Sequence, residues 1–218
     1  MKRVIAIDGP SGAGKSTLSR LLAEALGFEY LDTGALYRAA ALNLLRFGLD
    51  ERASDDEIRT ALEKTRITFS GGNVLLNGAD VSGEIRTPTA SHYASVFSAR
   101  RPVRQYLLQA QRDASTQSDL VAEGRDMTTI VFPDAYRKIY LDASVEERTK
   151  RRTAELLASG LEVDEDQICR KIIERDSRDS GRELAPLTKS KDAFYVDSTG
   201  LSKAEVLRTV MEFIGEIT

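Results

Sequence analysis

The strongest constraint on this chain is a loop sequence near its amino end, Gly9-Pro10-Ser11-Gly12-Ala13-Gly14-Lys15-Ser16. It matches the phosphate-binding pattern G-x-x-x-x-G-K-[S/T] at every fixed position. The apolar run at residues 4–7 predicts a buried strand before the loop, and the leucines and alanines on one face of residues 15–26 predict a helix after it. A loop of this kind between a strand and a helix is typical of α/β folds with a parallel sheet.

The residues of this loop suit the phosphates of ATP or GTP. Glycines let backbone N–H groups turn toward a phosphate, and the positive end of the following helix dipole adds to the attraction. Lys15 is expected to reach the β- and γ-phosphates, and the Ser16 hydroxyl to help hold Mg²⁺. The usual GTPases read guanine with an Asn-Lys-x-Asp segment, and this chain has no Asn-Lys pair. We therefore predict an ATP site formed by consecutive residues: Gly9, Pro10, Ser11, Gly12, Ala13, Gly14, Lys15, Ser16 and Thr17.

The alternation of strands and helices continues along the chain. Further strands are predicted at 29–32, 120–123, 138–141 and 193–196. Further helices are predicted at 33–47, 55–64, 102–115, 145–159, 164–180 and 202–215. Thr33 is the expected cap of the first of these helices. This pattern predicts an α/β three-layer fold with a five-stranded parallel sheet, in a single domain of residues 1–218. Residues 67–81 break the alternation, and the Asn77-Gly78 turn there predicts a small antiparallel β insert.

The composition argues against several classes of protein. The chain has 31 basic and 34 acidic side chains, and this near balance argues against a nucleic-acid polymer as partner. A single Cys and a single His exclude an intrachain disulfide, a Cys-rich metal site and a zinc site made of several His ligands. The apolar run after Met1 is too short for a signal peptide or a membrane span. We expect a cytoplasmic monomer with no membrane partner.

Charged residues that follow the other strands are candidates for binding a second substrate. Arg38 comes after the second strand, and Glu123, Arg125 and Asp126 lie at the end of the third. Ligands bind at the carboxyl ends of strands in open α/β sheets, so the two arginines are placed to hold an anionic acceptor. Asp126 is placed to accept a hydrogen bond from an amino group. Two alternatives remain. Arg38 is then a solvated helix residue, and Glu123 is either a Mg²⁺ ligand through water or a simple acid at the end of its strand.

Arginines also cluster between residues 148 and 186, a segment that ends near Pro186. Arg175, Arg178 and Arg182 share one helix face with Asp179, and Arg148, Arg151 and Arg152 precede them. Arginines three or four positions apart repel each other, so such a face attracts an anion. We predict a helical, arginine-rich lid that closes on the transferred phosphate; a solvated helix balanced by its own acids is the alternative.

Seven short segments, spread in order over nearly the whole chain, resemble the bacterial cytidylate kinases, within the P-loop nucleoside monophosphate kinase family. They are IDGPSGAGKST (7–17), LDTGALYR (31–38), DVSGEIRT (80–87), VAEGRD (121–126), VFPDA (131–135), ERDSRD (174–179) and APL (185–187). The resemblance implies the P-loop kinase fold, with a monophosphate-binding lobe at 33–100 that contains the β insert near 64–100. It departs at Thr128, where the family often has Gly, and at Ser16, where many members also have Gly.

The resemblance also implies roles for individual residues. Four are similar to family residues around cytosine: Thr33, Ser95, Arg104 and Asp126. Four are similar to the family's phosphate clamp: Arg38, Arg125, Arg175 and Arg182. Asp179 is similar to the residue that contacts the ribose, so these nine positions form the expected CMP site.

The activity implied by these positions is transfer of the γ-phosphoryl group of ATP to CMP or dCMP. The acceptor is already an anionic oxygen, so catalysis is expected from positioning and from charge neutralisation by Mg²⁺, Lys15, Arg125, Arg175 and Arg182. Two alternatives stay open: a P-loop kinase for UMP or another small acceptor, and an ATP-binding regulatory module.

Overall fold

The computed structural model describes residues 2–70, 73–116 and 118–215. A five-stranded parallel sheet runs in the order β2-β6-β1-β7-β8, which confirms the predicted sheet. In that order the strands are β2 (Glu29–Asp32), β6 (Leu120–Gly124), β1 (Val4–Asp8), β7 (Arg137–Asp142) and β8 (Phe194–Asp197). All five residues of β1 are buried, as expected for a central strand covered on both faces. The loop predicted to bind phosphate therefore starts from the middle of the sheet.

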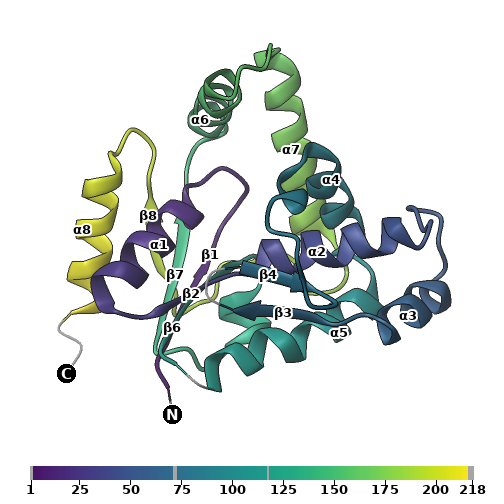
Figure 1. Ribbon diagram of the computed structural model, residues 1–218. Coiled ribbons are helices and arrows are strands. Elements are labelled where there is room, and N and C mark those ends of the chain that lie inside the picture. The colour runs from purple at the N-terminus through teal and green to yellow at the C-terminus, as the bar shows by residue number, and fades with distance from the viewer. Residues whose placement is uncertain (1, 71–72, 117, 216–218) are drawn as a thin grey trace. The chain divides into compact units, whose positions relative to one another are not determined.

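The chain divides into two compact units. Unit 2 consists of residues 4–29 together with the chain from residue 121 onward. Its helices are α1 (Lys15–Leu26), α6 (Val145–Ala158), α7 (Glu165–Gly181) and α8 (Lys203–Ile214), with a π-helical turn, η3 (Met127–Val131). Helices α1 and α8 lie side by side, and α6 packs against α7 (Figure 1). The predicted boundaries of all four helices agree with the structure to within about a residue.

Unit 1 consists mainly of residues 30–120. Its helices are α2 (Thr33–Arg46), α3 (Asp55–Glu63), α4 (Pro88–Phe97) and α5 (Arg101–Asp113), with short 3₁₀ turns η1 (Glu84–Arg86) and η2 (Ala114–Thr116). Three strands, β3 (Ile67–Ser70), β4 (Asn73–Leu76) and β5 (Ala79–Asp80), form an antiparallel sheet, which confirms the predicted β insert. Between β4 and β5, Asn77 and Gly78 both have positive φ angles, of 51° and 87°, as a tight hairpin turn requires.

The apolar side chains that give the sequence its periodicity are buried. Ile5, Ile7 and Leu22 in unit 2, and Leu44 and Phe97 in unit 1, have no exposed surface. Within the described ranges, no helix is long and apolar enough to cross a membrane. Burial of this kind supplies most of the free energy that stabilises such a fold.

Two local predictions differ from the structure. The cap of α2 is Asp32 and not Thr33, because the extended backbone at Asp32 lets its carboxylate accept the Ala35 N–H at 2.9 Å. The turn η3 was not predicted, because Met127–Val131 reads as an ordinary apolar run. Both differences lie directly after strands of the parallel sheet, where candidate site residues cluster.

Candidate functional site

The predicted phosphate loop lies between β1 and α1 in unit 2, at the carboxyl end of its strand (Figure 1). Gly9 is required there, since a Cβ atom at this residue would lie 1.9 Å from the carbonyl oxygen of Leu141. Gly14 caps α1 in a left-handed conformation. The loop therefore passes close to the end of β7 and delivers its last residues to the positive end of a helix.

Lys15, the first residue of α1, is only 5% exposed. Its ammonium donates a hydrogen bond to the carbonyl oxygen of Pro10 at 2.7 Å. Burial, together with the positive charges of Arg125 and Arg175, lowers the pKa of Lys15 to about 7, although nearby carboxylates act in the opposite direction. A buried amine among cations attracts an anion strongly, as the predicted role with phosphate requires.

Three arginines of the predicted phosphate clamp meet at one carboxylate in unit 2. The Asp179 carboxylate accepts a hydrogen bond from Arg125 Nε at 2.8 Å, and Arg182 and Arg175 lie 3.9 Å and 4.0 Å from it. Burial tends to raise the pKa of Asp179, but the three arginines outweigh burial and hold this pKa below its ordinary value. The structure thus brings together four of the residues predicted in this unit.

The remaining predicted lid arginines have other partners. Arg178 pairs with Glu174 at 3.6 Å, and Arg152 is exposed and pairs with Glu155 at 2.7 Å. Arg148 and Arg151 donate to backbone carbonyls of the phosphate loop instead of joining the group at Asp179. These four arginines therefore do not join the group at Asp179, and the arginine-rich lid stays a prediction.

The sequence analysis gave no role to the contact between Asp8, the last residue of β1, and the segment after β6. Asp8, fully buried at the end of β1, accepts hydrogen bonds from the Met127 N–H (2.9 Å), the Thr128 N–H (2.8 Å) and the Thr128 hydroxyl (2.7 Å). Burial raises the pKa of Asp8, although these hydrogen bonds oppose that shift. The carboxylate thereby fixes the start of η3, directly after Asp126, and explains the threonine at position 128.

A signal for this contact is present in the sequence. An acid at the end of an otherwise apolar buried strand needs hydrogen-bond donors, and Asp8 is such an acid. The sequence does not name the donors, which lie at residues 127 and 128. Asp126, predicted to bind an amino group, is 2% exposed, and Glu123 is 5% exposed at the end of β6.

In unit 1, the predicted CMP-binding residues lie on three helices: α2, and the helices α4 and α5 that both pack on it. Thr33 begins α2 and is 2% exposed, and Arg38 on the same helix pairs with Asp32 at 2.9 Å. Ser95 on α4 is 8% exposed, and its buried hydroxyl has no hydrogen-bond partner among the described residues. A buried hydroxyl without a partner is costly unless a ligand supplies one.

Arg104, on α5, is the fourth of these residues. It donates to the carbonyl oxygen of Ser98 at 3.1 Å, and its guanidinium carbon lies 5.7 Å from the centroid of the Tyr37 ring. These contacts link α5 to α2 and to the end of α4 through one planar donor.

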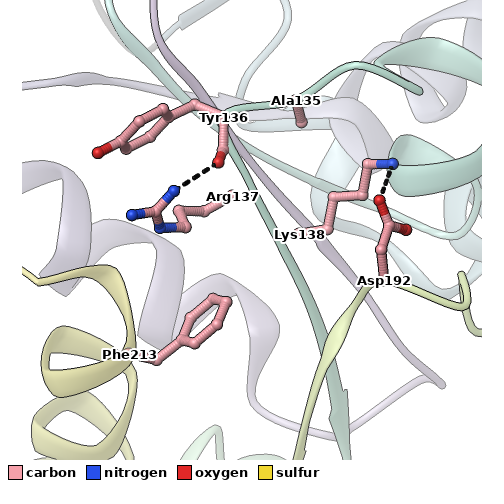
Figure 2. A pocket seen from close by; sticks show the side chains of 6 residues that line it. All are labelled: Ala135, Tyr136, Arg137, Lys138, Asp192 and Phe213. Atoms are coloured by element: carbon pink, nitrogen blue, oxygen red, sulfur yellow. Dashed lines mark hydrogen bonds and ion pairs between the residues drawn. The ribbon is translucent and has the colours of Figure 1, made fainter.

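A different hollow, at the amino end of β7, is a poor candidate for the nucleotide site. Its volume is about 290 Å³, and it is lined by Ala135, Tyr136, Arg137, Lys138, Asp192 and Phe213 (Figure 2). The charged groups in it already have protein partners: Lys138 pairs with Asp192 at 2.7 Å, and Arg137 donates to the last carbonyl of α8, that of Ile214, at 3.2 Å. It lies at the end of the sheet opposite to that where ligands bind in this class of fold.

Comparison with known proteins agrees with this geometry. The chain from residue 5 to residue 216 matches the family model described as cytidylate kinase. It is 49% identical over 220 residues to a cytidylate kinase of Thermodesulfovibrio yellowstonii, covering 99% of both chains, and 48% identical over 212 residues to one of Thermosipho melanesiensis, covering 97% and 96%. A gluconokinase of Sinorhizobium meliloti shares the fold, with a TM-score of 0.50 at 14% identity over 97% of this chain and 91% of the other. The chain belongs to the cytidylate kinase family.

Proposed function

We propose that this protein transfers the γ-phosphoryl group of ATP to CMP or dCMP, giving ADP and CDP or dCDP. The observation that carries the proposal is the match, over nearly the whole chain, to proteins named cytidylate kinase. The buried Lys15 of the loop and the arginines gathered at Asp179 support it, because phosphoryl transfer needs concentrated positive charge. The alternatives, another acceptor specificity or a regulatory module, are not favoured by these relatives.

The chemical step needs no general base. A phosphate oxygen of CMP forms a bond to the γ-phosphorus as the bond from that phosphorus to the β,γ-bridging oxygen breaks, and the bonding electrons leave with ADP. The acceptor oxygen carries no proton that must be removed near neutral pH. What remains for the protein is to align the groups and to neutralise their charge.

We assign these tasks to the two groups of residues already described. In unit 2, the loop from Gly9 to Thr17 binds the phosphates of ATP, and Lys15, Arg125, Arg175 and Arg182 act on the transferred phosphoryl group. Asp126 contacts the acceptor there, and Asp179 contacts its ribose. In unit 1, Arg38 contacts the acceptor phosphate, and the base is read by Thr33, Ser95 and Arg104.

Mg²⁺ fits the residues that the loop offers. Ser16 is exposed in the first turn of α1 and presents a hydroxyl, a ligand type suited to a hard cation. Over the described ranges, no three His, Cys, Asp or Glu side chains gather into a metal site, so the phosphates of ATP would supply most of its ligands. When bound, the ion neutralises charge on the β- and γ-phosphates.

We also propose that the enzyme acts as a cytoplasmic monomer. Every residue assigned above belongs to one chain, so no second copy is needed to complete the set. ATP and CMP are cytoplasmic metabolites, which supports that location. Sedimentation equilibrium at working concentrations tests the monomer, and cell fractionation tests the location.

The deciding experiment measures ADP formation by a coupled assay with CMP, dCMP, UMP, AMP or no acceptor. The expected result is rapid ADP formation with CMP or dCMP, slower formation with UMP, and little without an acceptor. The same preparation of a Lys15→Ala variant controls for a contaminating host kinase. ADP formation that does not depend on any monophosphate would overturn the proposal in favour of a regulatory module.

A further inference from the structure

The backbone carbonyls of the phosphate loop are held by side chains. For the loop N–H groups to converge on a phosphate, the carbonyls must point away from it, and a buried carbonyl needs a donor. Lys15 donates to the carbonyl oxygen of Pro10, Arg148 to that of Ser11 at 3.1 Å, and Arg151 to that of Ala13 at 3.2 Å. Two arginines of α6 therefore support the outer side of a loop that lies more than a hundred residues earlier.

Arg148 is the more deeply placed of the two, with 5% of its side chain exposed. Besides the Ser11 carbonyl, it donates from Nε to the carbonyl oxygen of Ala143 at 2.9 Å and pairs with Asp176 on α7 at 2.5 Å. Its Cβ also packs on Gly12, where an added Cβ would lie 3.2 Å away. One side chain thus joins the phosphate loop, the start of α6 and the middle of α7.

Helix α7 carries Arg175 and Asp179, and Arg182 caps its carboxyl end. All three are assigned to the acceptor or to the transferred phosphoryl group. The contact of Arg148 with Asp176 therefore connects the loop assigned to ATP with the helix that carries residues assigned to CMP. Because its donors already point to carbonyls and to a carboxylate, the guanidinium is oriented for support and not for contact with a phosphate.

We propose that Arg148 is a positioning residue, which keeps the phosphate loop in its anion-binding shape and couples that shape to α7 through Asp176. The inference rests on the proposed function, because that function assigns the loop to ATP. Its test does not depend on turnover, because the shape of the loop is followed through ADP binding. Arg151 assists at the Ala13 carbonyl and is itself held by the Ser198 carbonyl at 2.7 Å.

The chain supplies a matched control. Arg152 lies four positions after Arg148 on α6, but its side chain is 47% exposed and pairs with Glu155. The Arg148→Met variant is expected to weaken ADP binding, measured by calorimetry, by about tenfold or more, because charged hydrogen bonds to the loop are lost. CMP binding is expected to weaken less than ADP binding, because Arg148 reaches the CMP-binding residues of α7 only through Asp176. Arg152→Met is expected to change the binding of neither ligand by more than about twofold.

Two further variants guard against simple unfolding. Arg148→Lys keeps the charge beside Asp176 and is expected to recover part of the ADP affinity but not all, because one ammonium does not reproduce the guanidinium's fixed fork. Asp176→Asn is expected to weaken ADP binding less than Arg148→Met does, and to add nothing further in the double variant.

The outcomes separate this inference from the proposed function. A normal ADP dissociation constant with a strongly reduced kcat in Arg148→Met would place the arginine on the transferred phosphoryl group and overturn the positioning role. If the fold-losses of ADP affinity in Arg148→Met and Asp176→Asn multiply in the double variant, the two residues act independently, and the coupling is overturned. If the wild-type protein binds ADP but produces no ADP from ATP and CMP, the proposed function is refuted. The comparison of ADP binding between the wild type and the Arg148 variants remains valid in that case.

Discussion

Two buried hydroxyls, one in each unit, have opposite surroundings. Thr128 in unit 2 donates to the Asp8 carboxylate, whereas the hydroxyl of Ser95 in unit 1 has no partner within the described ranges. The contrast is local, because unit 2 also contains buried hydroxyls without a partner among the described residues, such as that of Thr129, beside polar groups held by loop carbonyls, such as the Lys15 ammonium and the Arg148 guanidinium. At Thr128, Lys15 and Arg148 the protein itself fixes the polar groups in place, whereas the hydroxyl of Ser95 is left to gain its hydrogen bond from a ligand.

This difference suggests a division of labour. Groups held in advance by the protein suit charge stabilisation, which depends on preorganised donors. A hydroxyl that gains its partner from the substrate suits base recognition, because a wrong base leaves it unsatisfied. Changes at Lys15 and in the phosphate loop should therefore alter kcat or ATP binding, and changes at the base-reading residues of α2, α4 and α5 should alter the KM for CMP.

The largest expected effect is that of Lys15→Ala. Removal of the buried cation should lower kcat by roughly 10³-fold or more, since a charge partner of the transition state is lost. The melting temperature should not fall, because a buried amine among other cations is itself unfavourable. Stopped-flow or coupled assays measure the rate, and Lys191→Ala, at an exposed position, is the control. Transfer that survives within about tenfold would contradict the role.

Arg104→Met tests the other side of the comparison. The KM for CMP is expected to rise by about tenfold while the KM for ATP stays nearly constant, because a half-buried donor to the base is lost. Arg101→Met, at an exposed position on the same helix, should leave both constants unchanged. Equal increases in the two KM values would argue that Arg104 only supports packing.

The pKa of Lys15 predicts a pH dependence for ATP binding alone. Phosphate beside the ammonium should raise its pKa from about 7 toward the ordinary range, so the complex holds more protons than the free protein above pH 7. At pH 8 close to one proton should be taken up, and ATP affinity should fall as the pH rises further, by at most about tenfold per unit. Calorimetry in buffers of different ionisation enthalpy measures the uptake, and Lys15→Met should abolish it.

The smallest effects concern the two hydroxyls. Thr128→Val should lower the free energy of unfolding by about 1–3 kcal/mol, because Asp8 keeps its burial but loses a donor. Thr129→Val is a close control, since the neighbouring hydroxyl is buried without a hydrogen-bond partner in the described part of the chain. Chemical denaturation compares the two, and equal losses would contradict the role given to the Asp8 contact.

Ser95→Ala should behave in the opposite way. The protein should be as stable as the wild type or slightly more so, because an unsatisfied buried group is removed. CMP affinity should fall by about two- to tenfold if the hydroxyl bonds to the substrate. A loss of stability with unchanged CMP affinity would show that Ser95 has a structural partner instead.

Much of the fold could be predicted because it follows from local patterns. The helix at Lys15–Leu26 and the Asn77-Gly78 turn both result from residue periodicity and turn chemistry. The turn η3 could not be predicted, since its first N–H groups bond to Asp8, which is 119 residues away from Met127. Its conformation depends on a tertiary contact that no local pattern reveals.

The site shows the same limit. The loop and the arginines around Asp179 were predicted from motif, strand ends and resemblance, whereas the different roles of Arg148 and Arg152 were not. The two arginines lie four positions apart on one helix. What distinguishes their roles is the hydrogen bond of Arg148 to the carbonyl of Ser11, which is 137 residues away in the chain. Helix periodicity does not show which of them meets the loop.

The contact of Lys15 with the Pro10 carbonyl has a consequence for turnover. The ammonium has three N–H donors, so a nucleotide can accept from one of them while the bond to Pro10 is kept. When ADP departs, the amine still has this acceptor and is not left without a partner in a dry interior. The loop thus eases the exit of its own product, which in many enzymes is the slow step of the cycle.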